Sequence, residues 1–146
     1  MVLSRHTVLI VASAPLVRRI TNRILTEEGY RVLEAADADE ALAVLGIPTA
    51  NVDLVLLDVV LPGTDGVALC ADISVWWPRM PILFLSAYPA EILASHGQRH
   101  LNRPFLGKPY GREELVTKVG TAIERRRAPR HDAEACHQER QQQPQT

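Results

Sequence analysis

Three side chains with complementary chemistry stand at the ends of three separate apolar runs. Asp58 follows Val55-Leu56-Leu57, Ser86 follows Phe84-Leu85, and Lys108 follows the short run at 104–107. A carboxylate can act as a nucleophile, while an ammonium group and a hydroxyl can contact the oxygens of the group that it receives. If the fold brings the three together, they predict a site that handles a phosphoryl group.

Each of these residues also has a purely structural interpretation. Asp58 could bond the amides of the following turn, Ser86 could satisfy its own turn, and Lys108 could be a surface lysine. For Asp58 the functional interpretation is favoured, because burying an unpaired acid beside an apolar strand is costly.

Buried strands are the elements that must position these side chains. The runs at 7–11, 53–58 and 82–86 are almost free of polar residues, which is typical of strands covered on both faces of a parallel sheet. Shorter strands are expected at 30–34 and 104–107. Helical spacing, caps and stops predict helices in between, at 15–28, 37–45, 66–77, 90–96 and 113–127.

Strands that alternate with helices pair in parallel through right-handed crossovers, so the fold class is α/β, a doubly wound five-stranded sheet in a three-layer sandwich. Open sheets of this kind hold ligands at the carboxyl ends of their strands. We expect one folded domain over residues 1–127. Residues 128–146 contain no large apolar side chain and predict a disordered tail.

Composition excludes several classes of protein. Of the 146 residues, 47% are hydrophobic and 23% charged, and the net charge is −1, so nothing favours nucleic acid or an anionic membrane as a partner. No apolar run approaches the length of a membrane span, and the N-terminus lacks the layout of a secretory signal, so a cytoplasmic protein is expected. Cys70 and Cys136 are too few for a disulfide framework.

The order of these motifs resembles the receiver domain of bacterial two-component response regulators. The match rests on Asp58 with Leu61-Pro62-Gly63 and Asp65-Gly66, and on Lys108-Pro109 downstream. The resemblance covers residues 5–127 and implies a flavodoxin-like sheet of strand order 2-1-3-4-5.

The resemblance also implies roles for individual residues. Asp58 matches the phosphoacceptor, Ser86 the hydroxyl residue that bonds the phosphoryl group, and Lys108 the lysine that is followed in that family by a cis peptide bond to proline. Phe105 matches the switching aromatic residue. A histidine kinase or phosphotransfer protein would be the phosphoryl donor, and a downstream protein would receive the signal.

One departure concerns the metal site. Family members carry two adjacent acids after the first strand, where this chain has Ala12 and Ser13. The remaining candidate ligands for Mg²⁺ are the Asp58 carboxylate and the backbone carbonyl of Val60. Because Mg²⁺ prefers oxygen ligands that include carboxylates, we expect its binding to be weak or absent and Lys108 to be the counter-ion of Asp58.

Two functions therefore remain open. The first is a single-domain receiver, not an enzyme, that accepts a phosphoryl group on Asp58 with a weakened dependence on Mg²⁺. The alternative is a pseudo-receiver, which uses the same fold as a protein-interaction module independent of phosphorylation. A hydrolase is disfavoured because Val60 stands where a second acid would act, and a flavin protein because the loop after the first strand lacks a phosphate cradle.

Overall fold

A five-stranded parallel sheet forms the centre of the protein. The computed structural model describes residues 6–87 and 104–126. The strands are β1 (Thr7–Val11), β2 (Arg31–Ala35), β3 (Leu54–Asp58), β6 (Ile82–Ser86) and β7 (Phe105–Gly107), in the order β2-β1-β3-β6-β7. Counted within this sheet, the order is the expected 2-1-3-4-5, so the doubly wound fold is confirmed.

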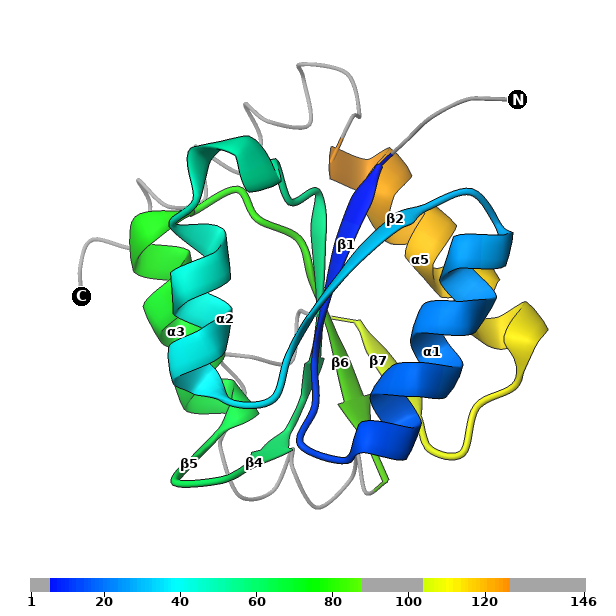
Figure 1. Ribbon diagram of the computed structural model, residues 1–146, viewed down its shortest axis with the longest axis horizontal. Coiled ribbons are helices and arrows are strands. Elements are labelled where there is room, and N and C mark those ends of the chain that lie inside the picture. Colours follow the sequence, from blue (N-terminus) through cyan, green and yellow to red (C-terminus); the bar gives the residue numbers. More distant parts are fainter. Residues whose placement is uncertain (1–5, 88–103, 127–146) are drawn as a thin grey trace, which may run out of the picture.

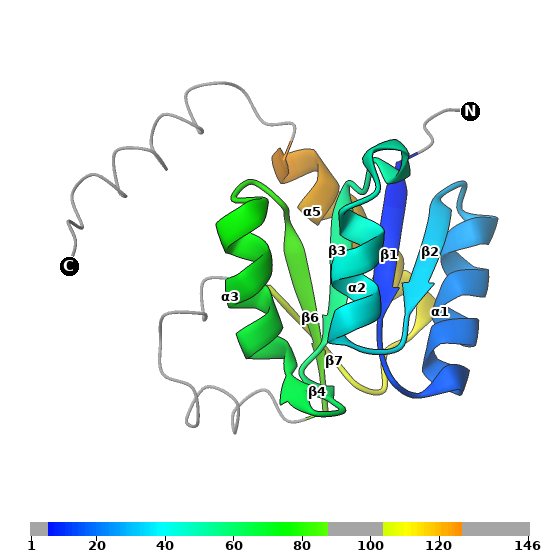
Figure 2. The ribbon, with the colours of Figure 1, turned by 60° about the vertical axis from the view of Figure 1, so that its left-hand side comes forward.

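Helices cover both faces of the sheet. Helices α2 (Ala38–Leu45) and α3 (Gly66–Trp76) lie on one face, and α1 (Pro15–Glu27) and α5 (Arg112–Arg126) lie on the other (Figures 1 and 2). The helix expected at 90–96 and the tail expected at 128–146 lie outside the described residues. Within the described ranges, no helix has the length and apolar character needed to cross a membrane.

The hydrophobic core consists of two layers that alternate along each strand. Leu9 and Val11 of β1 pack toward α2 and α3, whereas Val8 and Ile10 pack toward α1 and α5. Every residue of β1, β3 and β6 is buried, which confirms the prediction of strands covered on both faces. Asp58 and Ser86 are therefore carried by fully buried strands.

Local signals at the helix ends match the structure. Pro15 opens α1, and Gly29 follows it with a φ of 97°. Asp37 caps α2 by accepting a hydrogen bond from the Glu40 amide at 2.9 Å. At the end of α3, Trp77 packs on the core while Trp76 is exposed.

Two short elements were not predicted. Strands β4 (Val60–Leu61) and β5 (Thr64–Asp65) form a small antiparallel hairpin, and Pro48–Ala50 forms one turn of 3₁₀ helix (η1). Elements of two or three residues have no periodicity from which they could be recognised. Predicted boundaries also shift slightly: Asp53 lies before β3, where its side chain accepts a hydrogen bond from the Thr7 amide at 2.8 Å.

Candidate functional site

The predicted site residues meet at one edge of the sheet. In the strand register Asp58 lies opposite Leu85, so Ser86 follows directly on the neighbouring strand, and Ser86 in turn lies opposite Gly107. Lys108 is the next residue after β7. The carboxyl ends of three adjacent strands thus contribute the carboxylate, the hydroxyl and the ammonium group.

Asp58 and Lys108 form a closed ion pair. Lys108 Nζ donates to Asp58 Oδ2 at 2.6 Å, and the backbone amide of Val60 donates to Oδ1 at 3.2 Å. The Asp58 side chain is 6% exposed and that of Lys108 is 26% exposed. A carboxylate withdrawn from water in this way needs such partners, because burying an unpaired charge is costly.

The backbone around Ser86 and Lys108 fixes their spacing. The Lys108 amide donates to the Ser86 carbonyl at 2.8 Å, and the Lys108-Pro109 peptide is cis, as the resemblance implied. Ser86 itself is buried. Two neighbouring strand ends are therefore joined next to Asp58.

The candidate switch residue Phe105 stacks on Phe84 with 5.7 Å between ring centroids. The carbonyl oxygen of Phe105 accepts a hydrogen bond from Lys118 Nζ of α5 at 2.9 Å. Phe105 therefore connects β6, the strand of Ser86, with a helix on the other face of the sheet.

The end of β1 lies beside Asp58 but offers it no acid. Val11 is opposite Leu57 in the register, so the following residue, Ala12, neighbours Asp58. Ala12 is fully buried, and the Ala12 and Ser13 carbonyls both accept hydrogen bonds from Arg18 Nη1, at 2.6 Å and 3.2 Å. This loop is thus held by an arginine of α1.

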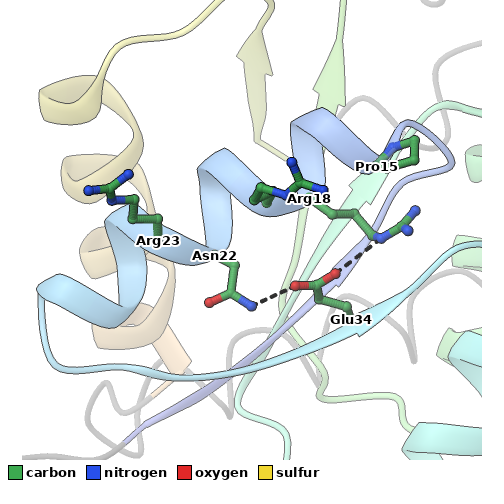
Figure 3. Close-up of a pocket in the computed structure, with 6 residues that line it drawn as sticks. Pro15, Arg18, Asn22, Arg23 and Glu34 are labelled. Carbon is green, nitrogen blue, oxygen red and sulfur yellow. Dashed lines mark hydrogen bonds and ion pairs between the residues drawn. The ribbon is translucent and has the colours of Figure 1, made fainter.

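A surface cavity of about 360 Å³ lies next to this arginine, between α1 and β2. Arg18 and Asn22 both point to Glu34 and bond its two carboxylate oxygens, at 3.1 Å and 2.6 Å (Figure 3). Arg23 points away from that cluster. The lining of the cavity includes none of Asp58, Ser86 and Lys108, so the cavity is separate from the strand-end site.

The donor set at the strand ends does not fit a strong magnesium site. Of the residues that end or follow β1, β3, β6 and β7, Asp58 alone has a carboxylate, and one of its oxygens is bound to Lys108. Across residues 6–87 and 104–126, no three His, Cys, Asp or Glu side chains gather as metal ligands. Mg²⁺ usually takes one or two carboxylates in addition to other oxygens.

The turn after Asp58 explains the Asp65-Gly66 motif. The Gly66 amide donates to the Val59 carbonyl at 2.6 Å, and a β-carbon at position 66 would lie 2.8 Å from the Val59 α-carbon. Only glycine permits this approach. Asp65 caps α3 by accepting a hydrogen bond from the Ala68 amide at 2.7 Å.

Two residues that the sequence did not single out connect the segment after Lys108 to α1. The hydroxyl groups of Tyr110 and Thr21 share a hydrogen bond of 2.7 Å, which joins the segment after Lys108 to α1. Burial raises the pKa of the Tyr110 hydroxyl, the bond to Thr21 lowers it, and the charge of Asp58 raises it further. Tyr110 could be suspected from its place after Lys108-Pro109, but nothing local indicated Thr21, which is 89 positions away.

Comparison with known proteins places this geometry in a family. The sequence model of the response regulator receiver domain matches residues 8–120. The chain belongs to the response regulator receiver family. Receiver domains of this family are parts of two-component signalling proteins.

Individual relatives agree with this assignment. The receiver domain is 34% identical over 118 residues to the transcriptional regulatory protein ResD of Bacillus subtilis, and 34% identical over 119 residues to the sensor kinase CckA of Brucella abortus. These matches cover 81% and 82% of this chain but only 48% of ResD and 13% of CckA. The solved receiver domain of an HD domain-containing protein from Pseudomonas fluorescens superimposes with a TM-score of 0.76 at 27% identity, covering 87% of this chain and 93% of that one.

Proposed function

We propose that this receiver domain accepts a phosphoryl group on Asp58 from a histidine kinase or phosphotransfer protein, with a weakened dependence on Mg²⁺, and passes the signal on by protein contact. The observation that carries the proposal is the buried Asp58 carboxylate, paired with Lys108 at a strand end next to Ser86. We propose that the chain is not itself an enzyme.

The chemistry is a transfer from nitrogen to oxygen. An Asp58 oxygen attacks phosphorus, the P–N bond of the donor phosphohistidine breaks, and the imidazole leaves with the bonding electron pair. Lys108, already 2.6 Å from Oδ2, then pairs with a phosphoryl oxygen, and the Ser86 hydroxyl donates to another.

Electrostatics supports the weakened dependence on metal. At about 4 Å and an effective dielectric constant of about 20, one unit charge pair is worth about 4 kcal/mol before desolvation, and a divalent ion doubles that figure. Ala12 and Ser13 contribute no such charge. In this structure, the positive charge next to the Asp58 carboxylate is that of the Lys108 ammonium group.

The proposed partners follow from the relatives. CckA is named as a sensor kinase and ResD as a transcriptional regulatory protein, which supports a kinase upstream and a protein output downstream. The net charge of −1 gives no support to direct nucleic-acid or membrane binding.

The same closed ion pair favours a second candidate, the pseudo-receiver. With Asp58 occupied by Lys108 and no acid at positions 12 and 13, the fold would act as a docking module whose partner binds irrespective of phosphorylation.

A phosphorylation assay distinguishes the two functions. The chain is incubated with acetyl phosphate over a range of Mg²⁺ concentrations, and intact mass spectrometry detects the added phosphoryl group. We expect labelling that Asp58→Asn abolishes and that the exposed control variant Asp39→Asn retains. A chain that takes no phosphoryl group and binds no beryllofluoride at any metal concentration would be a pseudo-receiver.

A further inference from the structure

The segment from Lys108 to Arg112 is attached to α1 at two points. Tyr110 shares its 2.7 Å hydrogen bond with Thr21, and Arg112 donates to Glu27 at 2.7 Å and to Glu28 at 2.8 Å. This short segment begins with the lysine that pairs with Asp58. Helix α1 therefore contacts the segment that presents the ammonium group.

The Tyr110–Thr21 contact is the more protected of the two. Thr21 is 1% exposed and Tyr110 is half-buried, whereas Arg112 and its two partners are largely exposed. Water competes less for a bond that is partly withdrawn from solvent, so this bond constrains the segment more than the exposed ion pairs do.

Lys108 needs such support because its side chain is long and rotatable. An ammonium group on four methylenes loses much conformational freedom when it is held at one carboxylate oxygen. The hydrogen bond from the Lys108 amide to the Ser86 carbonyl restrains the backbone at Lys108 itself. Two positions further along the chain, the bond of Tyr110 to Thr21 restrains the backbone that follows Lys108.

We propose that Tyr110 and Thr21 are positioning residues for Lys108: their hydrogen bond holds the Lys108 segment on α1, so that the position of α1 sets how firmly the ammonium group is held at Asp58. The relevance to signalling rests on the proposed function. If Asp58 is the phosphorylation site, this positioning lets a protein that docks on α1 change how firmly Lys108 is held there. The positioning itself concerns the unphosphorylated protein and can be measured there.

The chain offers a direct measurement, because Lys108 and Lys118 are its only two lysines. In protein labelled with ¹⁵N at the lysine side chains, hydrogen exchange of each ammonium group is followed separately. Lys118 also donates a hydrogen bond, to Phe105, and serves as the internal reference. In Tyr110→Phe and in Thr21→Val, we expect exchange at Lys108 to accelerate by about threefold to tenfold, with Lys118 unchanged.

Further variants separate positioning from general loosening. Thr21→Ser keeps the hydroxyl and should restore slow exchange at Lys108. The double variant of Tyr110→Phe with Thr21→Val should equal either single variant, because both remove the same bond. Tyr30→Phe removes the hydroxyl of another tyrosine that packs on the same core layer, and should leave Lys108 unchanged.

Unchanged exchange at Lys108 in both single variants would overturn the proposal, and so would equal acceleration at Lys108 and Lys118. A selective effect at Lys108 in a chain that takes no phosphoryl group would leave the positioning role in place and remove the proposed function alone.

Discussion

At the scale of single residues, the site is a charged pair placed where the fold would otherwise be apolar. Asp58 ends a strand whose residues are all buried, and hydrogen bonds from Lys108 and from the Val60 amide stabilise its carboxylate. The two members of the pair are not equivalent. Asp58 is nearly inaccessible to water, whereas about a quarter of the Lys108 side chain is exposed.

This asymmetry predicts unequal effects of removing either partner. Among the described residues, Lys108→Met leaves the buried carboxylate with the Val60 amide as its remaining partner, and we expect this variant to lower the free energy of unfolding by about 2–4 kcal/mol. Asp58→Asn leaves an ammonium group that can turn to water, so its cost should be smaller. Urea denaturation of both variants at neutral pH measures the difference. Equal losses would mean that Asp58 is as well solvated as Lys108.

Positions 12 and 13 give a second prediction at this scale. Because Ala12 neighbours Asp58 in the register, Ala12→Asp combined with Ser13→Asp should place two carboxylates at the site and raise Mg²⁺ affinity by about tenfold or more. Calorimetric titration with Mg²⁺ measures the affinity. Ala43→Asp combined with Thr49→Asp adds the same charge at exposed positions outside the site and serves as the control. Equal affinity in the two double variants would contradict a metal site at the end of β1.

At the scale of elements, the strands with the strongest sequence signal are the ones that carry the site. The fully buried runs of β1, β3 and β6 can be recognised without any partner, because burial on both faces requires apolar residues at every position. They placed Asp58 and Ser86 correctly at one edge. The capping of α2 by Asp37 was predictable for a similar reason, since the cap lies within four residues of its partner.

What the sequence did not predict depends on contacts between distant residues or on very short elements. The β4–β5 hairpin consists of two residues on each side. The Tyr110–Thr21 bond and the contacts of Arg112 with Glu27 and Glu28 join residues more than 80 positions apart. Such pairs leave no periodic pattern, and only the packing of α1 beside α5 brings them together.

The contribution of the contact between Glu27 of α1 and Arg112 of α5 to the stability of the fold depends on pH. The hydrogen bond from Arg112 is the largest cause that lowers the pKa of Glu27 below its usual 4.5. A carboxyl group with a lowered pKa in the folded state stabilises the protein above its unfolded pKa, and this contribution is lost as the pH falls through the folded value.

We therefore expect Arg112→Gln to lower the melting temperature at pH 7 and to have little effect once the pH is well below 4. Because Glu27 and Arg112 are both solvent-exposed, the effect at pH 7 should be small and should shrink further in 1 M salt, where the screening length is about 3 Å. Thermal melts of both proteins across this pH range test the expectation. Arg31→Gln, at an exposed arginine of β2, is the control. A melting-temperature difference that is constant with pH would assign Arg112 a role other than pairing with Glu27.

At the scale of the whole molecule, the charged site lies at one of the two ends of the sheet. The carboxyl ends of the strands carry the charged site, and the helices on both faces begin near that edge (Figures 1 and 2). The resemblance to receiver domains implies a route from Ser86 through Phe105 to the face formed by the fourth helix, β7 and α5. The fourth helix, expected at 90–96, lies outside the described residues.

The described residues contain a physical connection along that route. Ser86 ends β6, Phe84 on the same strand stacks with Phe105, and the Phe105 carbonyl accepts a hydrogen bond from Lys118 of α5. If Asp58 accepts a phosphoryl group as proposed, we expect the Ser86 hydroxyl to move toward the phosphoryl oxygens and to change the packing at the end of β6. Because core side chains are closely packed, we expect Phe105 to respond to this change.

We therefore expect a beryllofluoride mimic bound at Asp58 to shift the NMR signals of the Phe105 ring and of the Lys118 ammonium group. Asp58→Asn, which removes the acceptor of the mimic, should show neither shift under the same conditions. Phe84→Leu keeps an apolar side chain but removes the ring stack, and should weaken the response at Phe105 while leaving binding at Asp58 intact. In the wild-type chain, the shifts could instead be confined to the residues around Asp58, with the signals of Phe105 and Lys118 unchanged. That result would show that the mimic binds without any structural change reaching α5.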